Sequence, residues 1–123
     1  MEKKIPEKQK GVTRLAKALT HSINGFKACF RTEEAFRQEV ALAALLLPAG
    51  LWLGENGLEK SLLAGSVFIV LIVEMLNTAV ERAIDRISLD HHPLSGEAKD
   101  MGSSAVLLSL ILMGAVWTLV LFF

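Results

Sequence analysis

Four polar residues interrupt one of the apolar stretches of this chain: Glu74, Asn77, Glu81 and Asp85. Their spacing places them within an arc of about 80° on one face of a helix. Oxygen-bearing side chains on one face, with a further carboxylate nearby, are how proteins hold a hard cation such as Mg²⁺. The stripe therefore indicates an acidic, metal-binding site, for which Glu33 is a candidate second source of carboxylate oxygens.

Glu74 stands at the apolar end of this stripe. If its helix leaves the membrane near Val80, the rise per residue places Glu74 about 9 Å inside the boundary. An acidic side chain at that depth costs on the order of 3 kcal/mol, which favours a functional role. The alternative is a protonated Glu74 that is hydrogen-bonded across a helix interface. Glu81 and Asp85, taken alone, equally fit a solvated face that pairs with basic neighbours.

Three apolar segments can carry these residues through a membrane. Residues 103–123 contain no charge over 21 positions, and such a helix is roughly 31 Å long, enough to cross a hydrocarbon core of about 30 Å. Residues 58–80 reach that length only if Glu74 and Asn77 are included, and residues 34–53 only if the helix begins near Glu34. We predict a single all-α integral membrane domain, residues 1–123, with three transmembrane helices.

Basic residues give the expected orientation. Nine of the thirteen Lys and Arg residues precede Val40, and three of the others fall in residues 81–102. By the positive-inside rule, the N-terminus and residues 81–102 face the cytoplasm and the C-terminus faces the other side. Because the basic residues flank apolar spans instead of forming a folded basic surface, a nucleic-acid partner is not expected.

Residues 11–31 are predicted to form a helix of a different kind. Apolar side chains share one of its faces, and Lys, Arg, His and Asn occupy the other. This is the pattern of a helix that lies in the membrane interface; the alternative is an ordinary amphipathic helix packed on protein. Residues 1–10 are expected to be flexible. Thr32, followed by two glutamates, is predicted to be the N-cap of the first span.

The polar segment between the last two spans offers further candidates. Lys99, beside glycines at a membrane entrance, can hold a phosphate group, although a lysine that merely marks the inner face fits equally well. His91 and His92 suggest a metal only weakly, because no other His or Cys is near. The usual phosphate-binding and dinucleotide-binding glycine motifs are absent, as is the lipase Gly-x-Ser-x-Gly. The residues alone predict a membrane protein with an acidic cytoplasmic site.

Three strings in combination resemble the prokaryotic diacylglycerol kinase family. They are EAFRQE at residues 34–39, the stripe from Glu74 to Asp85, and the string GEAKDMG at residues 96–102. The resemblance runs from about Gly11 to the C-terminus. It implies a homotrimer in the bacterial inner membrane that transfers the γ-phosphoryl group of ATP to the primary hydroxyl of diacylglycerol. The product would be phosphatidic acid, used in phospholipid biosynthesis.

The resemblance also implies roles for individual residues. Glu74 would be the general base, and Glu33 and Glu81 would hold the Mg²⁺ that accompanies ATP. The nucleotide-binding residues would be Arg14, His21, Glu33, Asn77, Glu81, Asp90, His91, His92, Lys99 and Asp100, with His21 at a position where the family pattern has a tyrosine. The lipid site would comprise Ser22, Glu39, Glu74 and Ser103.

Other functions fit part of the pattern. Undecaprenol kinase shares the fold and the chemistry and differs only in its lipid substrate. A non-enzymatic proton-conducting subunit would use Glu74 as a membrane carboxylate but would leave Asn77, Glu81 and Lys99 without a role. A small structural or regulatory membrane protein would need only the interfacial helix. Release of ADP that depends on Mg²⁺ distinguishes a kinase from the last two.

Overall fold

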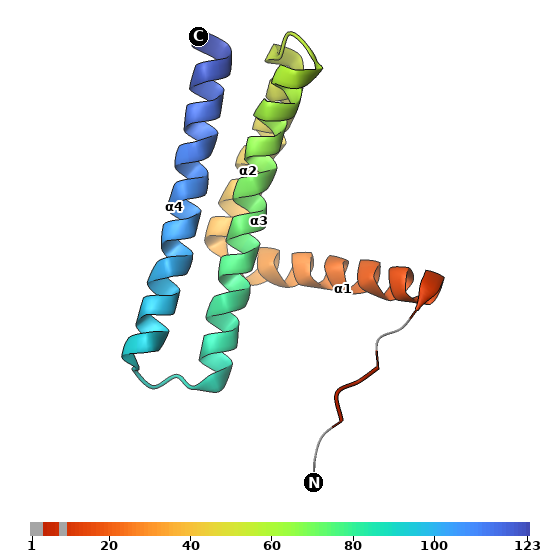
Figure 1. The fold of residues 1–123 in the computed structure, drawn as a ribbon, viewed down its shortest axis with the longest axis vertical. Helices are drawn as coiled ribbons and strands as arrows, with labels where there is room; N and C mark the ends of the chain where they lie inside the picture. Colours follow the sequence, from red (N-terminus) through yellow and green to blue (C-terminus); the bar gives the residue numbers. More distant parts are fainter. Residues whose placement is uncertain (1–3, 8–9) are drawn as a thin grey trace.

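The structure, a computed structural model, describes residues 4–7 and 10–123 of the chain. These residues form four α-helices and no strand: α1 (Gly11–Thr32), α2 (Glu34–Leu53), α3 (Gly57–Ile87) and α4 (Pro93–Phe122). The last three are long and apolar enough to cross a membrane. They run side by side, whereas α1 leaves them at a steep angle (Figure 1). The predicted fold class, an all-α membrane protein with three spans and a preceding amphipathic helix, is confirmed.

Two of the four helices, α3 and α4, extend further than hydropathy alone predicts. Helix α1 covers residues 11–31 and ends at Thr32, and α2 runs from Glu34 to Leu53. In contrast, α3 continues seven residues past Val80 to Ile87, and α4 begins ten residues before Ser103, at Pro93. Charged residues such as Glu, Arg and Lys are good helix formers, so apolar content locates the part of a helix suited to lipid and not its ends. The connection between α3 and α4 is therefore short, residues 88–92.

Two of the helix starts are capped by side chains. Asn56 Oδ1 accepts a hydrogen bond of 2.9 Å from the backbone N–H of Glu59 at the start of α3. His92 Nδ1 accepts from the backbone N–H of Leu94 at 3.1 Å, and Pro93 follows it in the first turn of α4. Pro is favoured there because the first-turn N–H groups have no helical partner.

The prediction that Thr32 caps α2 is wrong. Thr32 is the last residue of α1, and its hydroxyl donates to the carbonyl of Ala28 at 2.8 Å. The N-cap of α2 is Glu33, which has an extended backbone and makes no capping hydrogen bond through its side chain. Residues 4–7 belong to no helix, and the rest of the segment expected to be flexible, residues 1–3 and 8–9, lies outside the described residues.

Most large apolar side chains of the three long helices are exposed. Leu45 and Phe122 are 72% and 78% exposed, while Leu63 and Phe36 are among the few fully buried apolar residues. A water-soluble protein rarely exposes so continuous an apolar surface. The exposed faces therefore suit a hydrocarbon environment, which agrees with the three predicted spans.

Trp117 joins α4 to α3 near the end of the bundle where α2 and α3 connect. Its indole N–H donates to the carbonyl of Leu63 and to the hydroxyl of Ser66, both at 3.1 Å. Gly50 of α2 packs beside the indole ring: a Cβ added at Gly50 would lie 3.3 Å from it. One side chain thus contacts both neighbouring helices.

Replacing Trp117 with Phe should lower the free energy of unfolding by about 1 kcal/mol, because hydrogen bonds between membrane helices are individually modest. Unfolding of purified protein in mixed micelles, followed by circular dichroism, measures the change. Trp52→Phe is the matched control, since Trp52 is 84% exposed. Equal destabilisation by the two substitutions would contradict the assigned role of the Trp117 hydrogen bonds.

Candidate active site

Glu74 is buried between helices although it is ionisable. It lies in the middle of α3 with 7% of its surface exposed. Its carboxyl group lies close enough to the Glu39 carboxyl group on α2 for the two to interact. Glu39 Oε2 is buried and has no hydrogen-bond partner among the described residues. Two carboxyl groups from facing helices therefore share one apolar region, an arrangement suited to holding or moving a proton.

The polar stripe continues from Glu74 toward the C-terminal end of α3, as the spacing of its residues in the sequence predicts. Asn77 Nδ2 donates to Glu81 Oε1 at 3.4 Å, whereas Asn77 Oδ1 is buried with no partner in the part of the chain that the structure describes. Glu81 and Glu33 both lie close enough to Glu74 for electrostatic repulsion between the carboxylates. Three glutamates, Glu33, Glu74 and Glu81, are therefore gathered around two turns of α3, which makes this region attractive to cations.

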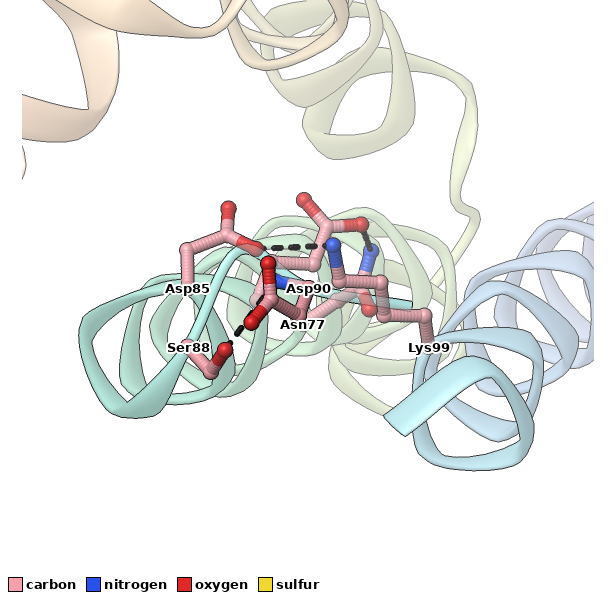
Figure 2. A network of polar contacts seen from close by, with 6 residues as sticks. Asn77, Asp85, Ser88, Asp90 and Lys99 are labelled. Atoms are coloured by element: carbon pink, nitrogen blue, oxygen red, sulfur yellow. Dashed lines mark hydrogen bonds and ion pairs between the residues drawn. The ribbon is translucent and has the colours of Figure 1, made fainter. Parts of the chain in front are cut away.

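The cation that completes the stripe comes from α4. Lys99 Nζ forms an ion pair of 2.8 Å with Asp85 Oδ1, four residues beyond Glu81. Figure 2 shows Lys99 reaching from its own helix across to Asp85, close to the Asn77 side chain. Of the basic neighbours considered as partners for the stripe, neither Arg82 nor Arg86 pairs with Asp85 in the described part of the chain. Because the two side chains are 42% and 46% exposed, water screens the pair and it is readily exchanged.

A small cavity adjoins Lys99 at the connection between α3 and α4. It has a volume of about 210 Å³, and its lining includes Asp90, His91, His92 and Ser95. Its walls mix polar and apolar groups, and the backbone N–H of Asp90 donates to Ser88 at 3.0 Å (Figure 2). The predicted residues of this segment therefore gather beside Lys99.

Other predicted site residues are not brought to this region within one chain. Arg14, His21 and Ser22 are exposed on α1, and the first turns of α1 lie at the end farthest from the bundle (Figure 1). The Ser22 hydroxyl donates only to the carbonyl of Ala18 in its own helix. Asp100 and Ser103 are exposed on α4.

Two arginines that the sequence analysis did not single out dock the end of α1. Arg37 of α2 donates to the carbonyls of Phe30 and Arg31, both at 2.9 Å, and satisfies acceptors that a helix end leaves free. Arg82 of α3 donates to the hydroxyl of Thr32. This junction holds Glu33, between α1 and α2, near α3. No short motif signals it, because the partners are backbone carbonyls and a distant threonine.

Cys29 is buried at the same junction, with 4% of its surface exposed. Burial raises the pKa of its thiol, so the thiol is a poor nucleophile and its role is to pack. A cavity beside Cys29 is also lined by Gly25, Thr78 and Arg82, among others. Packing and hydrogen bonding together fix the start of α2 relative to the stripe on α3.

The glutamates suit a metal ion that brings other ligands with it. No three His, Cys, Asp or Glu side chains of the described residues lie close enough to hold a metal by themselves. Mg²⁺ in phosphate-transferring enzymes needs only one or two carboxylates, together with water and substrate phosphates. Glu33 and Glu81, both half-buried beside Glu74, meet that requirement. The donor set therefore fits Mg²⁺ delivered with a nucleotide and does not fit a metal held by protein alone.

The fold and the site define a class: a small α-helical membrane protein with a buried carboxylate and a polar stripe that leads from it to a lysine. Comparison with known proteins specifies the family, since residues 20–121 match the model for prokaryotic diacylglycerol kinase. The chain is 44% identical over 116 residues to the diacylglycerol kinase of Haemophilus influenzae, covering 94% of this chain and 98% of that protein.

Two further similar proteins are also diacylglycerol kinases. The chain is 43% identical over 111 residues to the diacylglycerol kinase of Escherichia coli K12, covering 90% of this chain and 91% of that protein. It is 42% identical over 113 residues to that of Pseudomonas aeruginosa, covering 92% of each. The chain belongs to the prokaryotic diacylglycerol kinase family. It is a kinase and a bacterial membrane protein.

Proposed function

We propose that this enzyme transfers the γ-phosphoryl group of ATP to the primary hydroxyl of diacylglycerol and forms phosphatidic acid and ADP. The observation that carries the proposal is the burial of Glu74 at the head of a polar stripe that ends at Lys99. A lipid hydroxyl arrives from the apolar side and a nucleotide from water. The stripe joins these two environments, as a lipid kinase requires.

Glu74 acts as the general base in this mechanism. Its carboxylate takes the proton of the lipid hydroxyl while the hydroxyl oxygen attacks the γ-phosphorus and the bond to the β-phosphate oxygen breaks. Phosphoryl transfer depends mainly on positioning and charge neutralisation, which a few well-placed groups can supply. Glu39, which lies close to Glu74, would contact the lipid substrate, and Ser22 and Ser103 would have lipid-binding roles in the complete site.

The remaining residues serve the nucleotide. Lys99 exchanges Asp85 for a phosphate oxygen, and Asp100, Asp90, His91 and His92 lie around the base and sugar. Glu33 and Glu81 would hold the Mg²⁺ that accompanies ATP, and the bound ion would neutralise part of the phosphate charge. Asn77 steadies Glu81 through its amide nitrogen.

A homotrimer would complete the site. Arg14 and His21 have nucleotide-binding roles in this proposal, yet α1 carries them away from the stripe of its own chain (Figure 1). The α1 of one subunit would then serve the stripe of its neighbour. The protein would lie in the bacterial inner membrane, with the N-terminus and active site on the cytoplasmic side, since the basic residues cluster there.

The direct test is release of ADP by detergent-purified protein, with and without Mg²⁺, when offered diacylglycerol or undecaprenol. We expect release that requires both Mg²⁺ and diacylglycerol, and phosphatidic acid as the lipid product. Release with undecaprenol alone would keep the mechanism and replace the substrate. Folded protein that releases no ADP with either lipid would overturn the proposal in favour of a non-enzymatic role such as proton conduction through Glu74.

A further inference from the structure

Helix α4 passes unusually close to the Asn77 side chain at Gly102. A Cβ atom added at Gly102 would overlap Asn77 Oδ1 and would lie 3.1 Å from Asn77 Cγ. No other residue type can therefore occupy this position while the Asn77 amide keeps its orientation. At this position the backbone of α4 lies directly against the Asn77 amide.

This closeness is specific to one glycine of the helix. A Cβ added at Gly96 or at Gly114, which also belong to α4, would meet no described atom within 4 Å. Of the three glycines of α4, only Gly102 lies against a side chain of another helix.

The Asn77 amide is held by one long hydrogen bond only. Its nitrogen donates to Glu81 at 3.4 Å, a long bond, and its oxygen is buried without a partner among the described residues (Figure 2). A buried amide oxygen without a partner is costly, and one long hydrogen bond holds the amide only weakly. The position of the amide therefore depends on the space that neighbouring groups leave, and Gly102 leaves that space on the side of α4.

We propose that Gly102 is a positioning residue of the active site: its missing side chain leaves the Asn77 amide the space to point its nitrogen at Glu81. The inference rests on the proposed function, in which Glu81 binds the metal–nucleotide complex. Gly102 acts only through Asn77 and touches no reacting group. An alanine at this position would push the amide away and release Glu81 from its hydrogen bond.

The fold should tolerate such an alanine. The atoms that it overlaps form the end of a flexible side chain and not backbone, so rotation of Asn77 relieves the contact. Alanine also favours a helix more than glycine does. Gly102→Ala is thus expected to alter the site and leave unfolding unchanged or slightly more difficult, a combination that a general packing defect would not produce.

The first measurement is the side-chain amide NMR signal of Asn77. The chain has three asparagines, Asn24, Asn56 and Asn77, so selective asparagine labelling gives few signals, and Asn77→Ser identifies the relevant one. We expect Gly102→Ala to shift that signal and Gly114→Ala, the matched control, to leave it in place. An unmoved signal in Gly102→Ala would overturn the contact, whether or not the protein proves to be a kinase.

The second measurement is steady-state kinetics with Mg²⁺ and ATP. Displacement of a positioning group by about 1 Å can cost on the order of 100-fold in rate, and we expect kcat/KM of Gly102→Ala to fall by about that factor. Gly114→Ala should keep the wild-type value. The double variant Asn77→Ser/Gly102→Ala should be no less active than Asn77→Ser, because both changes remove the same interaction.

The outcomes separate the inference from the proposed function. A wild-type protein without kinase activity refutes the function, and the NMR signal still tests the contact. An active wild type whose Gly102→Ala variant shows a shifted signal and full activity refutes the positioning role. If the activity losses of the two single variants multiply in the double variant, Gly102 acts independently of Asn77 and the positioning role is refuted. If Gly102→Ala alone fails to fold, Gly102 serves general packing and the positioning role is likewise refuted.

Discussion

Replacing Glu74 with Gln should lower kcat by about 1,000-fold, because general base catalysis contributes on the order of 100- to 10,000-fold. The substitution keeps the size of the side chain and removes its ability to accept the hydroxyl proton. Since Glu74 is buried, with 7% exposed, a neutral amide should be tolerated at least as well as a carboxylate there. Loss of activity would therefore not reflect loss of fold. Initial rates of ADP release at saturating lipid and ATP measure the effect.

Glu55→Gln is the matched control for this prediction. Glu55 is an exposed glutamate in the connection between α2 and α3, at the opposite end of α3 from the ion pair of Asp85. Its substitution makes the same chemical change and should leave kcat within about twofold, as is usual for a surface substitution away from special features. If folded Glu74→Gln retained more than a tenth of wild-type activity, another group would have to be the base.

The sequence patterns predict the helices well because each depends on short-range regularities. The uncharged residues 103–123 and the spacing from Glu74 to Asp85 both concern neighbours along one helix, and the structure retains them as parts of α4 and α3. The place of Glu74 within an apolar segment follows from the same information, whereas its burial against other helices is known only from the structure. Hydropathy does not predict where α3 ends or where α4 begins, because charged residues continue a helix as readily as apolar ones.

The contacts between helices could not be predicted in the same way. Arg82 reaches Thr32 across 50 positions in the chain, and Lys99 reaches Asp85 across 14. Each contact depends on how the backbones cross, which no local pattern fixes. The close approach of Gly102 to Asn77 is of this kind, because the sequence does not show which side chain of the opposing helix lies against a helical glycine.

The ion pair of Lys99 with Asp85 leads to a second large expected effect. Lys99→Met should lower kcat/KM for ATP by about 100-fold, the usual scale when a group that stabilises developing charge is removed. Methionine retains much of the length and packing of the side chain, so the ammonium charge is the main loss. Kinetics at varied ATP, with saturating lipid and Mg²⁺, measure this value.

Asp85 provides the comparison that separates phosphate binding from a structural role. If the pair merely joined α3 to α4, Lys99→Met and Asp85→Asn would weaken the same contact and impair the enzyme alike. If Lys99 binds phosphate, the Asp85 carboxylate competes with the nucleotide for the ammonium group and repels its negative charge. Asp85→Asn should then lower KM for ATP by about twofold to fivefold, a small change because an exposed pair is weak. Shifts of KM in opposite directions would support the assignment of Lys99, and a rise in KM for both variants would refute it.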